Sequence, residues 1–177
     1  MKRFILILAI HSSAFALPPC GTSILSVIYD CHGTQKDRNG NWYQGDFRNG
    51  KFHGLGMIQF ANGDTFNGEF KENFVTQGII KYANGETYDG EWMGQTFNGQ
   101  GVYRYPVRED RNYISISIGE WKNGRPHGKH IQYDSNNCVL RSGVFELGLL
   151  KIFDTIDLTS FDKIKPINFN DCKPNGK

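Results

Sequence analysis

The sequence predicts an all-β protein: an elongated antiparallel meander of β-hairpin repeats that forms a single-layer twisted sheet, with short non-repeat caps at both ends. Three observations support this fold class. A glycine followed by an acidic and then an aromatic residue recurs at spacings of 23, 22 and 29 residues, and a period of about 20 to 50 residues is typical of repeat proteins. Aromatic residues alternate with that glycine as along a strand, and Asn-Gly pairs separate the strands as in hairpin turns. The recurring glycines are Gly45, Gly68, Gly90 and Gly119.

Residues 1–16 have the pattern of a signal peptide. Two basic residues precede an apolar run from Phe4 to Ile10, and Ala14 to Ala16 matches the small-residue cleavage pattern. We expect cleavage near Ala16 and export to the periplasm or the medium, and the apolar run is too short to leave a transmembrane segment in the mature chain. A buried N-terminal strand and a lipoprotein lipidated at Cys20 are the alternatives.

Residues 17–41 are predicted to form an N-terminal cap with half a repeat, whose Asn39-Gly40 pair matches the Asn-Gly pairs of the later units. Between the first two cysteines, Thr22 to Asp30 places apolar side chains on one helical face. This pattern favours a capping helix of one or two turns.

Residues 42–148 are predicted to be the repeat array, with about four repeats and a degenerate fifth one. In each unit an aromatic residue, the recurring glycine and a second aromatic residue lie on one face, because strand side chains alternate. A ring can then cover the bare glycine and restore the packing that glycine forfeits. In the fourth unit Ser117 stands where the leading aromatic belongs. The repeat-structural residues are Tyr43, Gly45, Phe47, Phe66, Gly68, Phe70, Tyr88, Gly90, Trp92, Gly119 and Trp121.

A second short strand, such as Gly56 to Phe60, follows in each unit, and we expect Asn-Gly to close the hairpin in a type I′ turn. Between the third and fourth units an insertion from Tyr105 to Trp121 replaces that pair, which predicts a projecting hairpin. Residues 149–177 have no clean period and are assigned to a C-terminal cap or tail.

The segment YQGDFRNGKFHGLGMIQFANGDT, Tyr43 to Thr65, resembles the repeat of the MORN (membrane occupation and recognition nexus) family. The resemblance covers about Cys31 to Gly148. The second unit lacks the family's His-Gly pair, the third has Asn98-Gly99 in its place, and the fourth has His130 where a second glycine belongs. The resemblance implies a hairpin-repeat fold and a scaffold or phospholipid-binding role, although an exported protein would not meet cytoplasmic phosphoinositides.

Four cysteines in an exported chain indicate disulfides. Three pairings are possible. We favour Cys20–Cys31 with Cys138–Cys172, because each bridge then closes one end of the array, where a terminal repeat has no outer neighbour.

The sequence indicates a protein that is not an enzyme and that holds no cofactor or metal. The acidic residues after the recurring glycines lie opposite the strand aromatics, about 9.5 Å apart on strands two apart, and we expect each to accept hydrogen bonds in its own loop. His127 and His130 form a His-x-x-His pair in a loop and not on a helix, unlike a zinc motif. Removal of residues 1–16 leaves equal numbers of basic and acidic residues, which gives no reason to expect nucleic acid binding. The acidic residues are Asp46, Glu69, Glu91 and Glu120.

Two function classes fit these features. The first is a non-catalytic exported scaffold for protein–protein interaction or self-association in the cell envelope, with one uncovered sheet face as the partner site. The alternative is a module that binds carbohydrate or anionic lipid, in which aromatic rows stack on sugar rings and a basic loop edge holds acidic groups. Rings packed against the tail would favour the scaffold, and a solvent-open aromatic row would favour glycan binding. The candidate basic edge, which could also be a solvated loop face, consists of Arg104, Arg108, Arg111, Arg125, His127 and Lys129.

Overall fold

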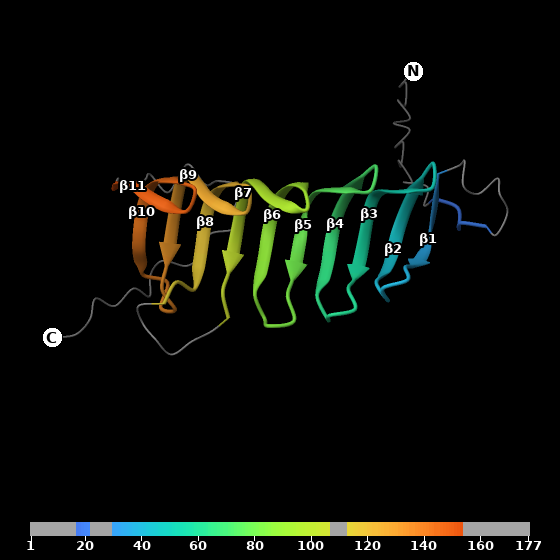
Figure 1. Cartoon of the computed structure of the whole chain (residues 1–177), viewed down its shortest axis with the longest axis horizontal. Coiled ribbons are helices and arrows are strands. Elements are labelled where there is room, and N and C mark those ends of the chain that lie inside the picture. The colour runs from blue at the N-terminus through green and yellow to red at the C-terminus, as the bar shows by residue number, and fades with distance from the viewer. Residues whose placement is uncertain (1–16, 22–29, 107–112, 154–177) are drawn as a thin grey trace, which may run out of the picture.

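The chain forms one open antiparallel sheet. The computed structural model describes residues 17–21, 30–106 and 113–153. In these residues eleven strands pair strictly in chain order, and there is no helix (Figure 1). The predicted all-β hairpin meander is therefore confirmed. The strands are β1 (Cys31–Lys36), β2 (Trp42–Arg48), β3 (Lys51–Gln59), β4 (Thr65–Lys71), β5 (Phe74–Lys81), β6 (Thr87–Gly94), β7 (Thr96–Arg104), β8 (Ile116–Lys122), β9 (Arg125–Tyr133), β10 (Val139–Glu146) and β11 (Leu149–Phe153).

Two predictions concern residues outside this description. The signal peptide, residues 1–16, lies wholly outside it. The capping helix predicted over Thr22 to Asp30 lies outside it except for Asp30, which is not in a helix or strand. Both stay predictions.

A row of glycines crosses the sheet. The register places a glycine opposite a glycine on every strand from β1 to β8, so their backbones lie side by side. The members of this glycine row are Gly33, Gly45, Gly56, Gly68, Gly78, Gly90, Gly101 and Gly119. Because glycine has no side chain, a large ring on the same face can lie directly on this backbone.

The leading aromatic of each of the first three units does lie on the glycine row, as predicted. A Cβ added to Gly56 would be 2.5 Å from the Tyr43 ring, and one added to Gly101 would be 2.5 Å from the Tyr88 ring. The Tyr43 hydroxyl donates a hydrogen bond to the Asp46 carbonyl oxygen at 2.8 Å. We call this side of the sheet the aromatic face, and the other side the opposite face.

A single-layer sheet can bury these rings because its hairpins bend over them. The β2–β3, β6–β7 and β8–β9 pairings shift register just after the glycine row, and such a bulge bends a strand and increases its twist. Figure 1 shows the hairpin ends turned over along one edge of the sheet. The bend stacks Phe52 on Tyr43 and Phe97 on Tyr88, each with ring centroids 3.7 Å apart.

Aromatic contacts join each repeat to the next. Tyr43 meets Phe70 edge-to-face at 5.3 Å, and Tyr88 meets Trp121 in the same way at 5.5 Å. The Trp121 indole N–H also donates to the Gly101 carbonyl oxygen, at 3.0 Å, on the neighbouring strand of the preceding repeat. A repeat is thus fixed to its neighbour by ring packing as well as by the sheet.

The turns differ from the prediction. The Asn62-Gly63 pair was expected to form a type I′ turn, but only Gly63 has a positive φ, and Gly63 N–H bonds to the Phe60 carbonyl. This loop is one residue longer than a type I′ turn. The positive-φ pair instead lies at Asn49-Gly50, in a stretch that the sequence had suggested was a loop, because β2 and β3 pair as far as Arg48 and Lys51.

The longer loops are tied to one another by side chains. Ala61 N–H donates to Asn41 Oδ1 at 3.0 Å, and Ala83 N–H donates to Asp64 Oδ1 at 2.8 Å. Both acceptors are the residue directly after an Asn-Gly pair.

The segment assigned to the C-terminal cap or tail begins with a strand. Position 148 lies in the turn between β10 and β11, and β11 pairs with β10 up to Phe153. The pairing continues because Gly143 occupies the row position beside His130, so β10 repeats the unit pattern.

We expect Tyr88→Ala to lower the free energy of unfolding by about 3–5 kcal/mol, the usual cost of removing a buried ring. Tyr88→Phe should cost about 1 kcal/mol, because it removes only the hydroxyl's bond to the Glu91 carbonyl. The measurement is urea unfolding followed by circular dichroism, with the exposed Met93→Ala as control, for which we expect a change within about 0.5 kcal/mol. Equal effects of Tyr88→Ala and Met93→Ala would contradict this account of the core.

Candidate functional site

The strand aromatics do not form a ligand-facing row. Tyr88 is 0% exposed, and Tyr43, Phe66 and Phe70 are 2% exposed. Rings covered in this way cannot stack on sugar rings. The solvent-open aromatic row that would have favoured glycan binding is therefore absent from the recurring strand positions.

The recurring acidic residues hold the bent hairpins. A Cβ added to Gly99 would lie 2.8 Å from Glu91 Cδ, and one added to Gly128 would lie 2.5 Å from Glu120 Cδ, so each carboxylate sits on a bare glycine of the following strand. Both glycines have a positive φ, at 80° and 57°. Lys129 N–H donates to Glu120 Oε1 at 3.3 Å. These contacts fit the structural role expected for the acidic residues.

His130 interrupts the glycine row and replaces a missing ring. It pairs with Gly119, where β9 would continue the row, and it is 0% exposed. Ser117 stands where Tyr43 and Tyr88 stand in their units, so a ring from the neighbouring strand fills the space that a tyrosine fills elsewhere. The Nδ1 atom of His130 lies 3.1 Å from the Glu120 carbonyl oxygen. The equivalent carbonyl oxygens in the first and third units, those of Asp46 and Glu91, accept hydrogen bonds from the tyrosine hydroxyls.

The contacts of His130 define its protonation state. Because a carbonyl oxygen only accepts, Nδ1 carries the hydrogen, and Nε2 then accepts the Ser117 hydroxyl at 2.7 Å. Burial lowers the pKa of His130 to about 4, partly opposed by the bond to the Glu120 carbonyl. The rings in contact with it, Trp121 and Phe145, carry no charge.

Ser117 and His130 are hydrogen-bonded like a catalytic nucleophile and its base, but solvent and substrate cannot reach them. Ser117 and His130 are both 0% exposed, so no substrate can reach the hydroxyl. His127 pairs with Glu120 and does not join His130 in a metal site. Within the described ranges no group of three or more His, Cys, Asp or Glu side chains could hold a metal ion.

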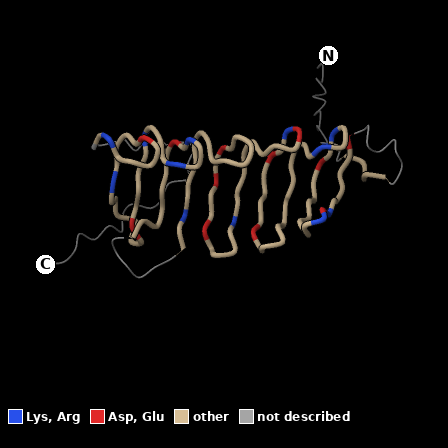
Figure 2. Tube along the Cα trace, in the orientation of Figure 1, with Lys and Arg blue, Asp and Glu red and all other residues tan. Residues whose placement is uncertain are grey.

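The four described residues of the candidate basic edge do not all lie together. Arg104 pairs with Ile116 at the start of β8, whereas Arg125 pairs with Lys122 at its end. The length of β8 separates them by about 20 Å, and Figure 2 shows the positive charges spread along both edges of the sheet. Arg108 and Arg111 lie outside the described residues. His127 and Lys129 follow Arg125 along β9, so these three are neighbours and Arg104 is not.

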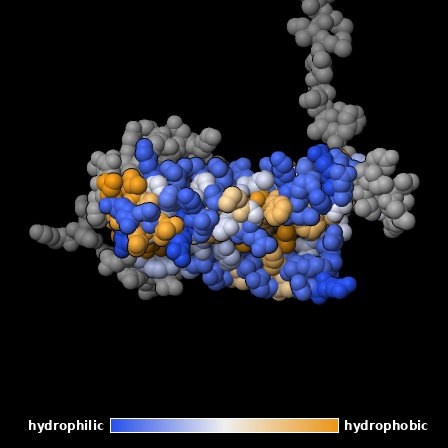
Figure 3. Space-filling view, turned by 45° about the horizontal axis from the view of Figure 1, so that its top comes forward, coloured by the Kyte–Doolittle hydropathy of each residue, from blue (hydrophilic) through white to orange (hydrophobic). Residues whose placement is uncertain are grey.

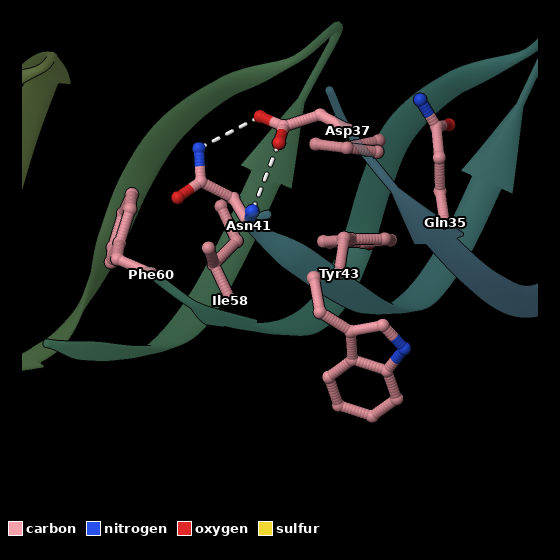
Figure 4. Close-up of a pocket in the computed structure, with 8 residues that line it drawn as sticks. Gln35, Asp37, Asn41, Tyr43, Ile58 and Phe60 are labelled. Atoms are coloured by element: carbon pink, nitrogen blue, oxygen red, sulfur yellow. Dashed lines mark hydrogen bonds between the residues drawn. The ribbon is translucent and has the colours of Figure 1, made fainter. Parts of the chain in front are cut away.

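A small cavity, of about 110 Å³, opens beside the first repeat (Figure 4). It lies at the N-terminal end of the array. On β3 the residue paired with Tyr43 is the apolar Ile58, whereas on β1 it is the polar Gln35. Its polar rim is fixed by Asn41, whose backbone N–H and side-chain Nδ2 both donate to Asp37. Ligand pockets usually measure about 300–1,000 Å³, so this cavity can hold one small side chain. The lining residues are Gln35, Asp37, Asn41, Trp42, Tyr43, Phe52, Ile58 and Phe60.

The two ends of the sheet differ. At the N-terminal end Cys20 and Cys31 form the predicted disulfide, and Pro18 to Cys20 hydrogen-bond to the outer edge of β1 through His32. This segment covers the β1 edge at His32. Cys138 is also in a disulfide, and its predicted partner Cys172 lies outside the described residues.

The family model described as MORN repeat matches residues 43–65, 88–107 and 118–129. These ranges contain the units with a His-Gly or Asn-Gly pair in the bent hairpin, and they omit the second unit, which lacks that pair. A search of the curated proteins finds no match to the chain.

We expect the folded state to lose stability as the pH falls from 6.5 to 4. In the unfolded chain the imidazole of His130 has its usual pKa of 6.5 and binds a proton within this window. In the folded protein the buried ring stays neutral down to its pKa of about 4, so protonation favours the unfolded state. The loss should reach about 3 kcal/mol below pH 4. It is measured as the difference in urea unfolding free energy between pH 7 and pH 4.5, relative to a variant without the histidine.

The matched variant is Ser117→Tyr with His130→Gly, which restores the arrangement of the other units. We expect it to fold and to lack this part of the pH dependence. His130→Gly alone should be less stable than the double variant, because it leaves the ring space empty. An identical pH dependence in wild type and double variant would refute the role of His130.

Proposed function

The repeat array of this chain belongs to the MORN repeat family, and from this premise we propose that it is a non-catalytic scaffold that binds a protein partner through its β11 end. MORN repeats are non-enzymatic, and they are associated with binding to proteins or membranes. Among the described residues no helix is long and apolar enough to cross a membrane.

The observation that carries the proposal is the apolar surface at the end of the sheet. Leu149 is 66% exposed, Ile152 is 58% exposed and Leu147 is 51% exposed. Figure 3 shows hydrophobic residues gathered over the β10–β11 end. Isolated exposed leucines are ordinary, but a contiguous apolar patch favours an interaction site.

The same end offers an open strand edge. β11 is last in the sheet order, and no described strand pairs with its outer side. An unpaired edge presents backbone N–H and C=O groups that another strand can satisfy. On the β1 edge the backbone N–H and C=O of His32 are already bonded to Pro18 and Cys20, which favours the β11 end as the place where a partner strand pairs.

These features favour a protein partner over a lipid or a glycan. A strand edge is completed by another polypeptide, and neither alternative supplies a row of backbone amides. Lys151 lies 3.6 Å from Glu146 in an ion pair, so the patch has little net charge to attract anionic headgroups. Of the described basic residues, Arg104 and Arg125 lie at opposite ends of β8.

We also propose that the protein acts outside the cytoplasm. Disulfides persist in oxidising compartments, and the bridge between Cys20 and Cys31 supports this location. The signal-peptide pattern of residues 1–16 points the same way.

We expect a photo-crosslinking amino acid at Leu149 to give one discrete protein adduct in the cells that produce the chain. The control carries the same group at Leu55, which is 71% exposed on the opposite face of β3. Adding Ile152→Asp should abolish the Leu149 adduct, because a charge on the patch opposes apolar contact. An adduct of twice the chain mass identifies self-association. Adducts at Leu55 alone, or at neither position, would refute the proposal.

Export is tested by mass spectrometry of the protein from its native compartment. We expect an N-terminus at Leu17 and no alkylation of Cys20 or Cys31 without a reductant. An intact Met1, or a lipid attached to Cys20, would contradict the predicted cleavage.

A further inference from the structure

The opposite face of the sheet carries a straight row of polar and aromatic side chains beside the long loops. Each member pairs directly with the next across neighbouring strands from β1 to β5, so all of them lie on one face at intervals of about 5 Å. Four strand spacings give the row a length of about 19 Å. We call it the polar strip, and its members are Lys36, Trp42, Gln59, Thr65 and Lys81.

The tryptophan of the strip differs from the other two tryptophans. Trp92 and Trp121 lie on the aromatic face, and their indole N–H groups donate to backbone carbonyl oxygens at 3.1 Å and 3.0 Å. Trp42 directly precedes Tyr43 on β2, so its side chain lies on the opposite face. There it is partly exposed, and its indole N–H has no hydrogen-bond partner among the described residues. The N–H is therefore available to a ligand.

A hollow of about 350 Å³ opens at Trp42. Three members of the strip line it, and two of the long loops form its sides. Its volume lies in the range of about 300–1,000 Å³ that is usual for ligand pockets. A flat ring can lie on the indole there, with an ammonium group on one side and an amide on the other. The lining residues from the strip are Lys36, Trp42 and Gln59, and the loops contribute Gly40, Ala61 and Gly63.

The strip offers positive charge to a ligand. Lys36 and Lys81 are exposed, and neither ammonium group forms an ion pair with a described carboxylate. The carboxylates of the adjoining loops instead accept hydrogen bonds from loop groups or from a tyrosine hydroxyl, as Figure 4 shows for Asp37. These carboxylates belong to Asp37, Asp64 and Glu86.

The acidic residues on the same face of β2 and β4 are too distant to cancel this charge. Asp46 lies four residues along β2 from Trp42, and Glu69 lies four residues along β4 from Thr65. Each separation is about 13 Å, which exceeds the screening length of about 8 Å at physiological ionic strength.

We propose that the polar strip binds a linear polysaccharide of uronic acids, with one sugar ring stacked on Trp42 and the chain running across the strands. The apolar face of a pyranose suits the indole, the Gln59 and Thr65 side chains suit its hydroxyl groups, and lysine ammonium groups pair with its carboxylates. An extended 1,4-linked chain advances by about one strand spacing per sugar, so successive strands meet successive rings.

The row continues beyond the strip and then ends. Arg104 on β7 lies two strands past Lys81 in the same row and supplies a further cation. On β8 the next position is Ile116, which packs against the apolar cluster of Val102, Ile118 and Ile131. The binding surface therefore extends from β1 to β7. It is separate from the β11 end and adds to the function proposed there.

The spacing of the cations favours a polysaccharide over other polyanions. One strand of DNA places a phosphate about every 3.4 Å, whereas Lys36 and Lys81 are about 19 Å apart. A membrane surface calls for several apolar side chains around the cations, and Trp42 is the single one in the strip.

Binding is tested by titration calorimetry of the full-length protein with an oligomer of 1,4-linked uronic acid. We expect binding that weakens as salt is added, and binding at least about tenfold weaker to a neutral 1,4-linked glucose oligomer of the same length. Absence of binding to the uronic acid oligomer overturns the proposal. So does binding to vesicles of anionic phospholipid in its place.

Variants locate the site. We expect Trp42→Ala and Lys81→Ser each to raise the Kd of the uronic acid oligomer by about tenfold, whereas Trp42→Tyr and Lys81→Arg keep most of the affinity. The matched control is Lys71→Ser, which removes the same charge from the hairpin end of β4, outside the strip. Equal losses for Lys71→Ser and Lys81→Ser would show an effect of net charge alone and refute the site.

Tryptophan fluorescence gives a readout that does not depend on the stability of Trp42→Ala. The oligomer should shift the emission of the wild type, because Trp42 borders the hollow whereas the other two tryptophans lie on the aromatic face. In Trp42→Tyr, with its fold verified by circular dichroism, the oligomer should leave the emission unchanged. A shift that persists in this variant would place the ligand elsewhere and overturn the proposal.

Discussion

A ring lying on a pair of cross-strand glycines is the contact on which this structure depends. The glycine row lets Tyr43 or Tyr88 approach the backbone, and the bulge after the row bends the hairpin so that a second ring covers the first. These two features give a single layer of strands a buried core. Because each unit completes its core with rings of the next, the array can grow by one hairpin at a time.

An array built in this way has two ends, and the structures of these ends differ. At β1 a disulfide-held segment bonds to the edge at His32, where it occupies backbone groups that another strand could otherwise use. At β11 no described strand pairs with the outer edge, and its neighbourhood is apolar.

The fourth unit shows how far the contact can vary. Ser117 removes the ring from one strand and His130 returns one from the next, with a hydrogen bond to the same carbonyl position. The His130 ring fills the space that a tyrosine ring fills in the first and third units, but unlike tyrosine it titrates in the acidic range. In the same strands the opposite face becomes apolar, so β7 to β9 differ from the earlier repeats on both sides of the sheet.

The sequence by itself determined the repeat, the strands and the buried rings, because these follow from local alternation and from recurring glycines such as Gly45 and Gly90. It also suggested that Cys20 pairs with Cys31. It could not place the tight turn, because both Asn49-Gly50 and Asn62-Gly63 have suitable residues, and only the pairing register separates them. Nor could it show that His130 faces Ser117, or that Arg104 and Arg125 lie at opposite ends of β8. Tertiary structure decided these points, since register and bending set which side chains meet across strands, whereas sequence periodicity sets only which face of its own strand each side chain occupies.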